Sequence, residues 1–133
     1  MLRCFVSGPH GLREAAWHAG ESAPNGALWV DLRDPTADEE RAVEGLLGLN
    51  VPTREEMREI EASSRLRVEE GGLIMTATVL AGSEGDRPEA AAVTFIRTPR
   101  LLATVRYSDP RSFQTFVARA ERHAASSGKD LVA

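Results

Sequence analysis

The chain has 133 residues, a length that predicts one domain able to bury a hydrophobic core without disulfides. Hydrophobic residues make up 42% and charged residues 27%, as in ordinary soluble globular proteins. The net charge of −4 disfavours a nucleic-acid partner, because phosphate binding needs a concentrated basic surface.

The first part of the chain is predicted to contain two strands separated by a short helix. Residues 2–6 are apolar enough for a buried strand, and residues 7–11 form a turn cluster. A short helix is expected over residues 12–19. After a loop, residues 27–32 form a second compact apolar strand. The N-terminus has no signal-peptide pattern, and no apolar run approaches the roughly 20 residues of a membrane span.

Two helix starts carry the same signature. Thr36 and Glu39 fit a capping box, in which each side chain satisfies a backbone N–H at the helix entry. Gly48 suits the left-handed position just past the end of this helix. Thr53 and Glu56 form a second capping box, so a short, highly charged helix is predicted to begin there.

The second half of the chain is predicted to be rich in strands and to end in a helix. The expected strands are residues 66–70, 73–80, 91–97 and 101–106. The last two of these are the best hairpin candidate. Asp109 and Pro110 suit an N-cap and a first helical position, so a final helix begins there. This mixed order predicts an α/β domain with helices packed on a mixed sheet.

The carboxylates of the second helix are the first candidates for chemistry. Glu55 and Glu59 are i, i+4 neighbours that could bind a divalent cation or act as an acid and a base. Arg58 is close in sequence to both, and a solvated, salt-bridged helix face is the favoured explanation. A hydrolytic enzyme that uses Glu55, Glu56 or Glu59 is the least favoured of the functions considered.

Other polar motifs have simple structural explanations. Ser63-Ser64-Arg65 could hold an anion, but a turn after the helix is the simpler interpretation. Asp31 ends a buried strand, where α/β proteins often place functional groups. Because Asp34 and Pro35 follow at once, turn formation is the simpler account of this region.

The remaining reactive residue types also form no recognisable site. The three histidines lack the spacing of a metal site, and the chain has no nucleophile elbow or phosphate loop. Cys4, the only cysteine, is expected to be a buried thiol, and Trp17 and Trp29 are expected in the core or at its rim. The residues alone therefore predict a soluble α/β domain without a convincing catalytic set.

An ordered set of short motifs adds a resemblance to a known family. These motifs are Trp29-Val30-Asp31-Leu32, Pro35-Thr36, Leu47-Gly48-Leu49, Pro52-Thr53, Glu59-Ile60-Glu61, Ser63-Ser64-Arg65, Val93-Thr94-Phe95 and Leu102 to Tyr107. In this order and spacing they resemble the cytoplasmic N-terminal domain of CorA-type magnesium and cobalt transporters. The resemblance extends from about Trp29 to Arg122.

The resemblance implies an α/β/α sandwich of three layers around a central mixed sheet of about six strands. It also implies a homopentameric, channel-like transporter with a long stalk helix, two C-terminal spans and a Gly-Met-Asn motif at the pore. The sequence contains no Gly-Met-Asn, stalk or span. We therefore expect residues 1–133 to be a single soluble regulatory domain on the cytoplasmic side of the membrane, not an enzyme and not an ion conductor by itself.

The resemblance also implies a regulatory metal site between neighbouring subunits. One family ligand is an acid in the loop after the strand at residues 73–80, and this loop offers Glu84 and Asp86. Mg²⁺ prefers oxygen ligands and retains several waters, so one carboxylate from each subunit is plausible chemistry. Because the partner acid belongs to the stalk, we expect binding by this chain to be weak, at millimolar levels or absent.

Two alternatives accompany the transporter hypothesis. The chain could be a free-standing, non-catalytic binding or scaffold domain of the same fold, or it could come from the branch of the family that handles Zn²⁺ rather than Mg²⁺ or Co²⁺. The coding sequence after Ala133 discriminates the first alternative, because two apolar spans and Gly-Met-Asn would indicate transport.

Overall fold

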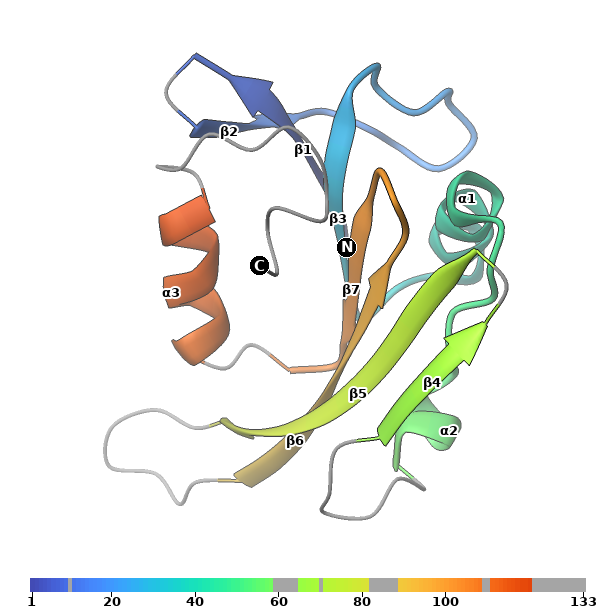
Figure 1. The fold of residues 1–133 in the computed structure, drawn as a ribbon, viewed down its shortest axis with the longest axis vertical. Helices are drawn as coiled ribbons and strands as arrows, with labels where there is room; N and C mark the ends of the chain where they lie inside the picture. The colour runs from blue at the N-terminus through green and yellow to red at the C-terminus, as the bar shows by residue number, and fades with distance from the viewer. Residues whose placement is uncertain (10, 59–64, 70, 82–88, 109–110, 121–133) are drawn as a thin grey trace.

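The chain folds around one seven-stranded mixed β-sheet (Figure 1). This computed structural model describes residues 1–133 apart from residues 10, 59–64, 70, 82–88, 109–110 and 121–133. The strands are β1 (Leu2–Gly8), β2 (Gly11–Ala15), β3 (Ala27–Arg33), β4 (Arg65–Glu69), β5 (Gly72–Ala81), β6 (Glu89–Arg97) and β7 (Leu102–Arg106). The helices are α1 (Ala37–Leu47), α2 (Arg54–Arg58) and α3 (Arg111–Ala120). The predicted α/β class with a mixed sheet is confirmed, with seven strands instead of about six.

The sheet has the strand order β2-β1-β3-β7-β6-β5-β4. β3 and β7 run parallel, and the other neighbouring strands in this order pair antiparallel. The predicted hairpin between β6 and β7 is confirmed, and the Thr98 N–H donates to the Leu101 carbonyl at 2.8 Å to close its turn. The parallel contact places the ends of β3 and β7 side by side, although the two strands are far apart in sequence.

The helix predicted over residues 12–19 is wrong, because β2 pairs with β1 there as a hairpin. In its register Leu12 lies opposite Ser7, and Gly11 lies opposite Gly8. The φ of Gly11 is 135°, a value that side chains other than glycine rarely adopt. So short a segment is marginal as a helix, whereas pairing gives it backbone hydrogen bonds and buries Leu12.

Side chains alternate between two hydrophobic cores on the two faces of the sheet. The core that we call the α1 face contains Val30 and Leu32 of β3 together with Val43 of α1 and Met57 of α2. The other core, the α3 face, contains Trp29 of β3 and residues of α3. Helices therefore lie on both faces of the sheet (Figure 1).

Both capping boxes predicted from the sequence are confirmed. At the start of α1, the Thr36 N–H donates to Glu39 Oε1 at 3.0 Å, and the Glu39 N–H donates to Thr36 Oγ1 at 3.2 Å. At the start of α2, the same exchange joins Thr53 and Glu56 at 3.2 and 3.1 Å. α1 ends as predicted at Gly48, with a φ of 74°. Local sequence therefore sets where these helices begin and where α1 ends.

Replacing Thr36 with Ala is expected to lower the free energy of unfolding by about 1 kcal/mol. The change leaves the Glu39 N–H without its side-chain acceptor at the entry to α1. Equilibrium urea unfolding measures the loss, and Thr36→Ser serves as the control because serine keeps the capping oxygen. A Thr36→Ala protein with an unchanged urea midpoint would show that this cap contributes nothing to stability.

Candidate functional site

Apart from Asp31, the carboxylates selected from the sequence as candidates for chemistry either lie outside the described residues or are exposed on α2. The predicted metal ligands Glu84 and Asp86 lie outside the described residues, as does Glu59. Glu55 and Glu56 are exposed on α2, where Glu56 takes part in the capping box. Within the described part of the chain, no group of three or more His, Cys, Asp or Glu side chains could hold a metal ion.

The remaining sequence candidates have structural roles or lie outside the described residues. Ser63 and Ser64 are among the residues that the structure does not describe. Cys4 is fully buried, and burial raises the pKa of its thiol to about 11, as expected for an unreactive core cysteine. Trp17 and Trp29 are both buried, which confirms their predicted place in the core.

Asp31 is the buried acid at the centre of the α3 face. In the sequence analysis, a turn was weighed against a functional group for the region of Asp31. Asp31 does not lie in a turn, because it is inside β3. Its carboxylate forms an ion pair with the Arg106 guanidinium, with Arg106 Nη2 2.9 Å from Asp31 Oδ2. Both residues are almost completely buried, with exposed fractions of 1% and 2%. The turn begins three residues later, at Asp34, which has a φ of 44°.

Further buried groups extend this pair across the α3 face. Thr104 Oγ1 donates to Asp31 Oδ1 at 2.7 Å, and the indole N–H of Trp29 donates to Thr104 Oγ1 at 3.0 Å. The Arg106 guanidinium lies 4.2 Å from the ring centroid of Phe113 on α3. The network therefore joins β3, β7 and α3. Sequence reasoning singled out Asp31 but missed Thr104 and Arg106.

This network has the character of a structural element. A buried charge is costly unless it is paired and hydrogen-bonded, and here both conditions are met. Asp31 and Arg106 face each other beneath α3, where both side chains are almost completely buried. The network therefore fixes the parallel contact of β3 with β7 and the position of α3.

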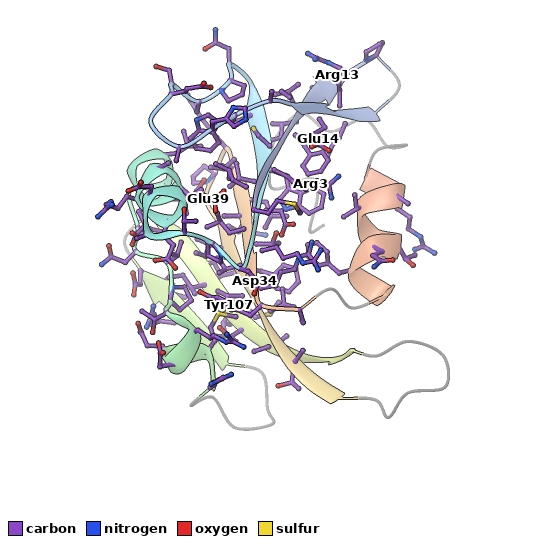
Figure 2. All side chains as sticks on the ribbon, turned by 180° about the vertical axis from the view of Figure 1, so that it is seen from behind. Arg3, Arg13, Glu14, Asp34, Glu39 and Tyr107 are labelled. Atoms are coloured by element: carbon purple, nitrogen blue, oxygen red, sulfur yellow. The ribbon has the colours of Figure 1, made fainter. Side chains whose placement is uncertain are left out.

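A second polar cluster lies where β3 and β7 end, the edge at which α/β sheets often bind ligands. Figure 2 shows Asp34 and Tyr107 at this edge, and the Asp34 N–H donates to the Arg106 carbonyl at 3.0 Å. The Tyr107 hydroxyl donates to Glu40 Oε1 of α1 over a long 3.5 Å. The Arg54 guanidinium lies 5.3 Å from the Tyr107 ring centroid. The cluster thus ties the strand ends to α1 and α2.

The protonation behaviour of this edge follows from burial and from like charges. Burial raises the pKa of Glu40, and the neighbouring Glu44 carboxylate raises it further. Burial also raises the pKa of Tyr107, with Glu40 adding to the effect. For Glu39, burial acts upward, but hydrogen bonds from Thr36 and the terminal ammonium outweigh it and leave the pKa lowered. The Glu39 and Glu40 carboxylates thus accept hydrogen bonds from other groups of the protein.

A groove of about 780 Å³ lies at the opposite end of the parallel strand pair. The loop before β3, the last turn of α1 and the β6–β7 turn form most of its wall. Leu46, Leu47 and Leu101 give it an apolar lining, and Arg100 adds a positive charge. The groove has the size of a small-molecule site but offers no acid–base pair among its described lining residues.

No helix in the described part of the chain is long and apolar enough to span a bilayer.

Comparison with known proteins identifies the relatives of this chain. No protein-family model matches it. The magnesium transport protein CorA of Salmonella typhimurium is 32% identical over 102 residues, which are 77% of this chain and 32% of that protein. The chain is a homologue of the CorA magnesium transport proteins. It spans about a third of the length of the curated CorA relatives it matches.

Solved structures show the same fold. The full-length CmaX protein has a TM-score of 0.70 and 13% identity, over 99% of this chain and 42% of that one. The CorA magnesium transporter from Methanocaldococcus jannaschii has a TM-score of 0.58 and 14% identity, over 96% of this chain and 40% of that one. The resemblance to CorA inferred from the sequence motifs is therefore confirmed, and the match is consistent with a CorA-type N-terminal domain.

Proposed function

We propose that this chain is the cytosolic regulatory domain of a CorA-type magnesium transporter, with Co²⁺ as a second transported ion, and that it senses divalent cations. The observation that carries the proposal is the homology to CorA over 102 residues, 77% of the chain. The shared fold supports it over almost the whole chain. In a homopentamer, the domain would contact its neighbours and bias the pore toward its closed state when metal is bound.

The segment between β5 and β6, residues 82–88, is the proposed metal-sensing element. It contains Glu84 and Asp86, two carboxylates of the kind that Mg²⁺ and Co²⁺ prefer as ligands. Since a magnesium ion keeps several waters, one carboxylate from this loop and one from a neighbouring subunit would suffice. This explains why the described part of one chain need not contain a complete cluster. Zn²⁺ is the alternative cargo, and uptake measurements with each ion distinguish the two.

A chimera tests the proposal directly. The chain replaces the homologous stretch of Salmonella typhimurium CorA, and Mg²⁺ uptake is followed in cells that lack other magnesium transporters. We expect uptake that is suppressed as internal Mg²⁺ rises. Glu84→Gln combined with Asp86→Asn should raise the internal Mg²⁺ needed for suppression severalfold, because the sensing carboxylates lose their charge.

The matched control removes two exposed carboxylates elsewhere, with Asp38→Asn and Glu55→Gln. This variant changes the net charge equally and should behave as the unsubstituted chimera. A chimera that is suppressed by Mg²⁺ equally well with and without Glu84 and Asp86 would contradict the proposed metal site. A chimera that assembles and transports but does not respond to Mg²⁺ at all would contradict the regulatory role.

A further inference from the structure

The groove beside the β6–β7 turn is a hollow whose lining residues all belong to the described part of this chain. Four segments that are distant in sequence form it: the loop before β3, the last turn of α1, Gly71 between β4 and β5, and the β6–β7 turn. Its volume of about 780 Å³ lies in the range of small-molecule sites, roughly 300–1,000 Å³. The domain thus supplies every wall of this groove by itself.

Apolar side chains form the floor of the groove and part of its rim. Leu28 and Leu101 line it and are buried, with exposed fractions of 7% and 5%. Leu46 on the last turn of α1 lines the same groove but is 40% exposed. A single exposed leucine is ordinary on a protein surface. Here, however, the leucine borders a hollow with an apolar floor, so a ligand with an apolar body would remove this surface from water.

The groove carries a positive charge in a chain that is negative overall. Arg100 is the only charged residue among the lining residues, although the net charge of the chain is −4. The side chains of Arg100 and Asn25 are both exposed, and neither has a hydrogen-bond or ion-pair partner among the described residues. Arg3, by contrast, is paired with Glu14 at 2.8 Å. Two sets of N–H donors therefore remain available next to the apolar floor.

We propose that this groove binds a small amphiphilic carboxylate. The apolar body of the ligand lies on Leu28, Leu46 and Leu101, and its carboxylate binds Arg100. A guanidinium binds a carboxylate through two parallel N–H···O bonds, and the amide of Asn25 can donate a further one. The inference does not rest on the proposed transport function.

Other classes of ligand match the lining less well. A metal ion or an organic cation would find no carboxylate among the lining residues. A polyphosphate needs several positive groups or a ring of backbone N–H groups at a helix start, and the lining offers one arginine and the end of a helix. One negative charge on an apolar body is what this lining complements.

A titration with octanoate, followed by the backbone amide NMR signals of the chain, tests the site. The dissociation constant is expected to be on the order of 1 mM, because a ligand of about ten non-hydrogen atoms gains little from each atom. The shift changes should concentrate on the residues that line the groove. An absence of shift changes up to about 10 mM octanoate, or changes centred on the exposed Leu66 and Val68 of β4, would overturn the proposal.

The preference for a carboxylate is tested with a neutral ligand and a charge variant. Octanamide should bind the wild-type chain about tenfold more weakly than octanoate. In Arg100→Gln this preference should vanish, because octanoate binding weakens while octanamide binding does not change. Arg119→Gln removes the same charge from an exposed position on α3, across the sheet, and should keep the preference. An Arg100→Gln protein that still prefers octanoate tenfold would overturn the assigned role of Arg100.

The groove must also be open in a longer protein, since this chain spans about a third of its CorA relatives. In the CorA chimera, Leu46→Cys should react with a water-soluble thiol reagent, and octanoate at about ten times its dissociation constant should slow the reaction roughly tenfold. The chimera without this substitution gives the background, to which the buried Cys4 contributes little. A Leu46→Cys thiol that does not react in the assembled chimera would show that protein covers the groove, and would overturn the proposal. This outcome is independent of any response of the chimera to Mg²⁺.

Discussion

Replacing Asp31 with Ala is expected to lower the free energy of unfolding by about 3–5 kcal/mol. The Arg106 guanidinium, only 2% exposed, would lose the carboxylate that it contacts at 2.9 Å and remain charged in the core. Thr104 would also lose its acceptor at 2.7 Å. A domain of this kind is stable by only about 5–15 kcal/mol, so the loss is a large fraction of the total. Urea unfolding followed by tryptophan fluorescence measures it.

Two control proteins separate loss of the ion pair from general disturbance. Asp34→Asn changes an exposed acid three residues away and should alter the free energy of unfolding by less than about 0.5 kcal/mol. The double variant Asp31→Leu with Arg106→Met should recover most of the loss, because it removes both buried charges together. A double variant as unstable as Asp31→Ala would show that the cost comes from packing and not from the unpaired charge.

Much of the fold could be predicted because its signals are local. Thr36 and Thr53 carry capping boxes whose partners are three residues away, and the structure forms both. The β6–β7 hairpin likewise follows from alternation and from the turn that contains Pro99. The helix prediction for residues 12–19 was wrong because the conformation of this segment depends on its pairing with β1. Its hydrophobic pattern is too short to distinguish the period of a helix from that of a strand.

The polar network could not be predicted because its members are distant in sequence. Asp31 and Arg106 are 75 residues apart, and only the parallel pairing of β3 with β7 brings them together. A partial signal was present, since Thr104 and Arg106 alternate with apolar residues in β7 and so place two polar groups on one face. The sequence does not reveal that this face lies beneath α3.

The same limit applies to the candidate sites. Glu84 and Asp86 were selected by family resemblance and lie outside the described residues, so their role stays a prediction. Leu66 and Val68 show the alternation of a strand, but alternation cannot tell a covered face from an open one. Their exposure arises because β4 lies at the end of the strand order away from the core that α3 covers, and this arrangement is a property of the whole sheet.

Replacing Trp29 with Ala is expected to lower the free energy of unfolding by about 3–5 kcal/mol. Trp29 is fully buried and stacks on Phe5 with a centroid distance of 4.5 Å. Its ring also lies 5.9 Å from that of Phe113, so the truncation opens a cavity between β1 and α3. Urea unfolding followed by circular dichroism measures the change. A loss below about 1 kcal/mol would mean that the core collapses to fill the space.

Trp29→Phe separates the hydrogen bond of Trp29 from its packing. Phenylalanine keeps an aromatic ring next to Phe5 but lacks the N–H that donates to Thr104 Oγ1 at 3.0 Å, so a smaller loss of about 1–2 kcal/mol is expected. Trp17 then remains as the only tryptophan and reports the folded state. Combining Trp29→Phe with Thr104→Val should show a coupling free energy of about 1 kcal/mol. Strictly additive losses would show that the indole contributes through packing alone and that the polar network ends at Thr104.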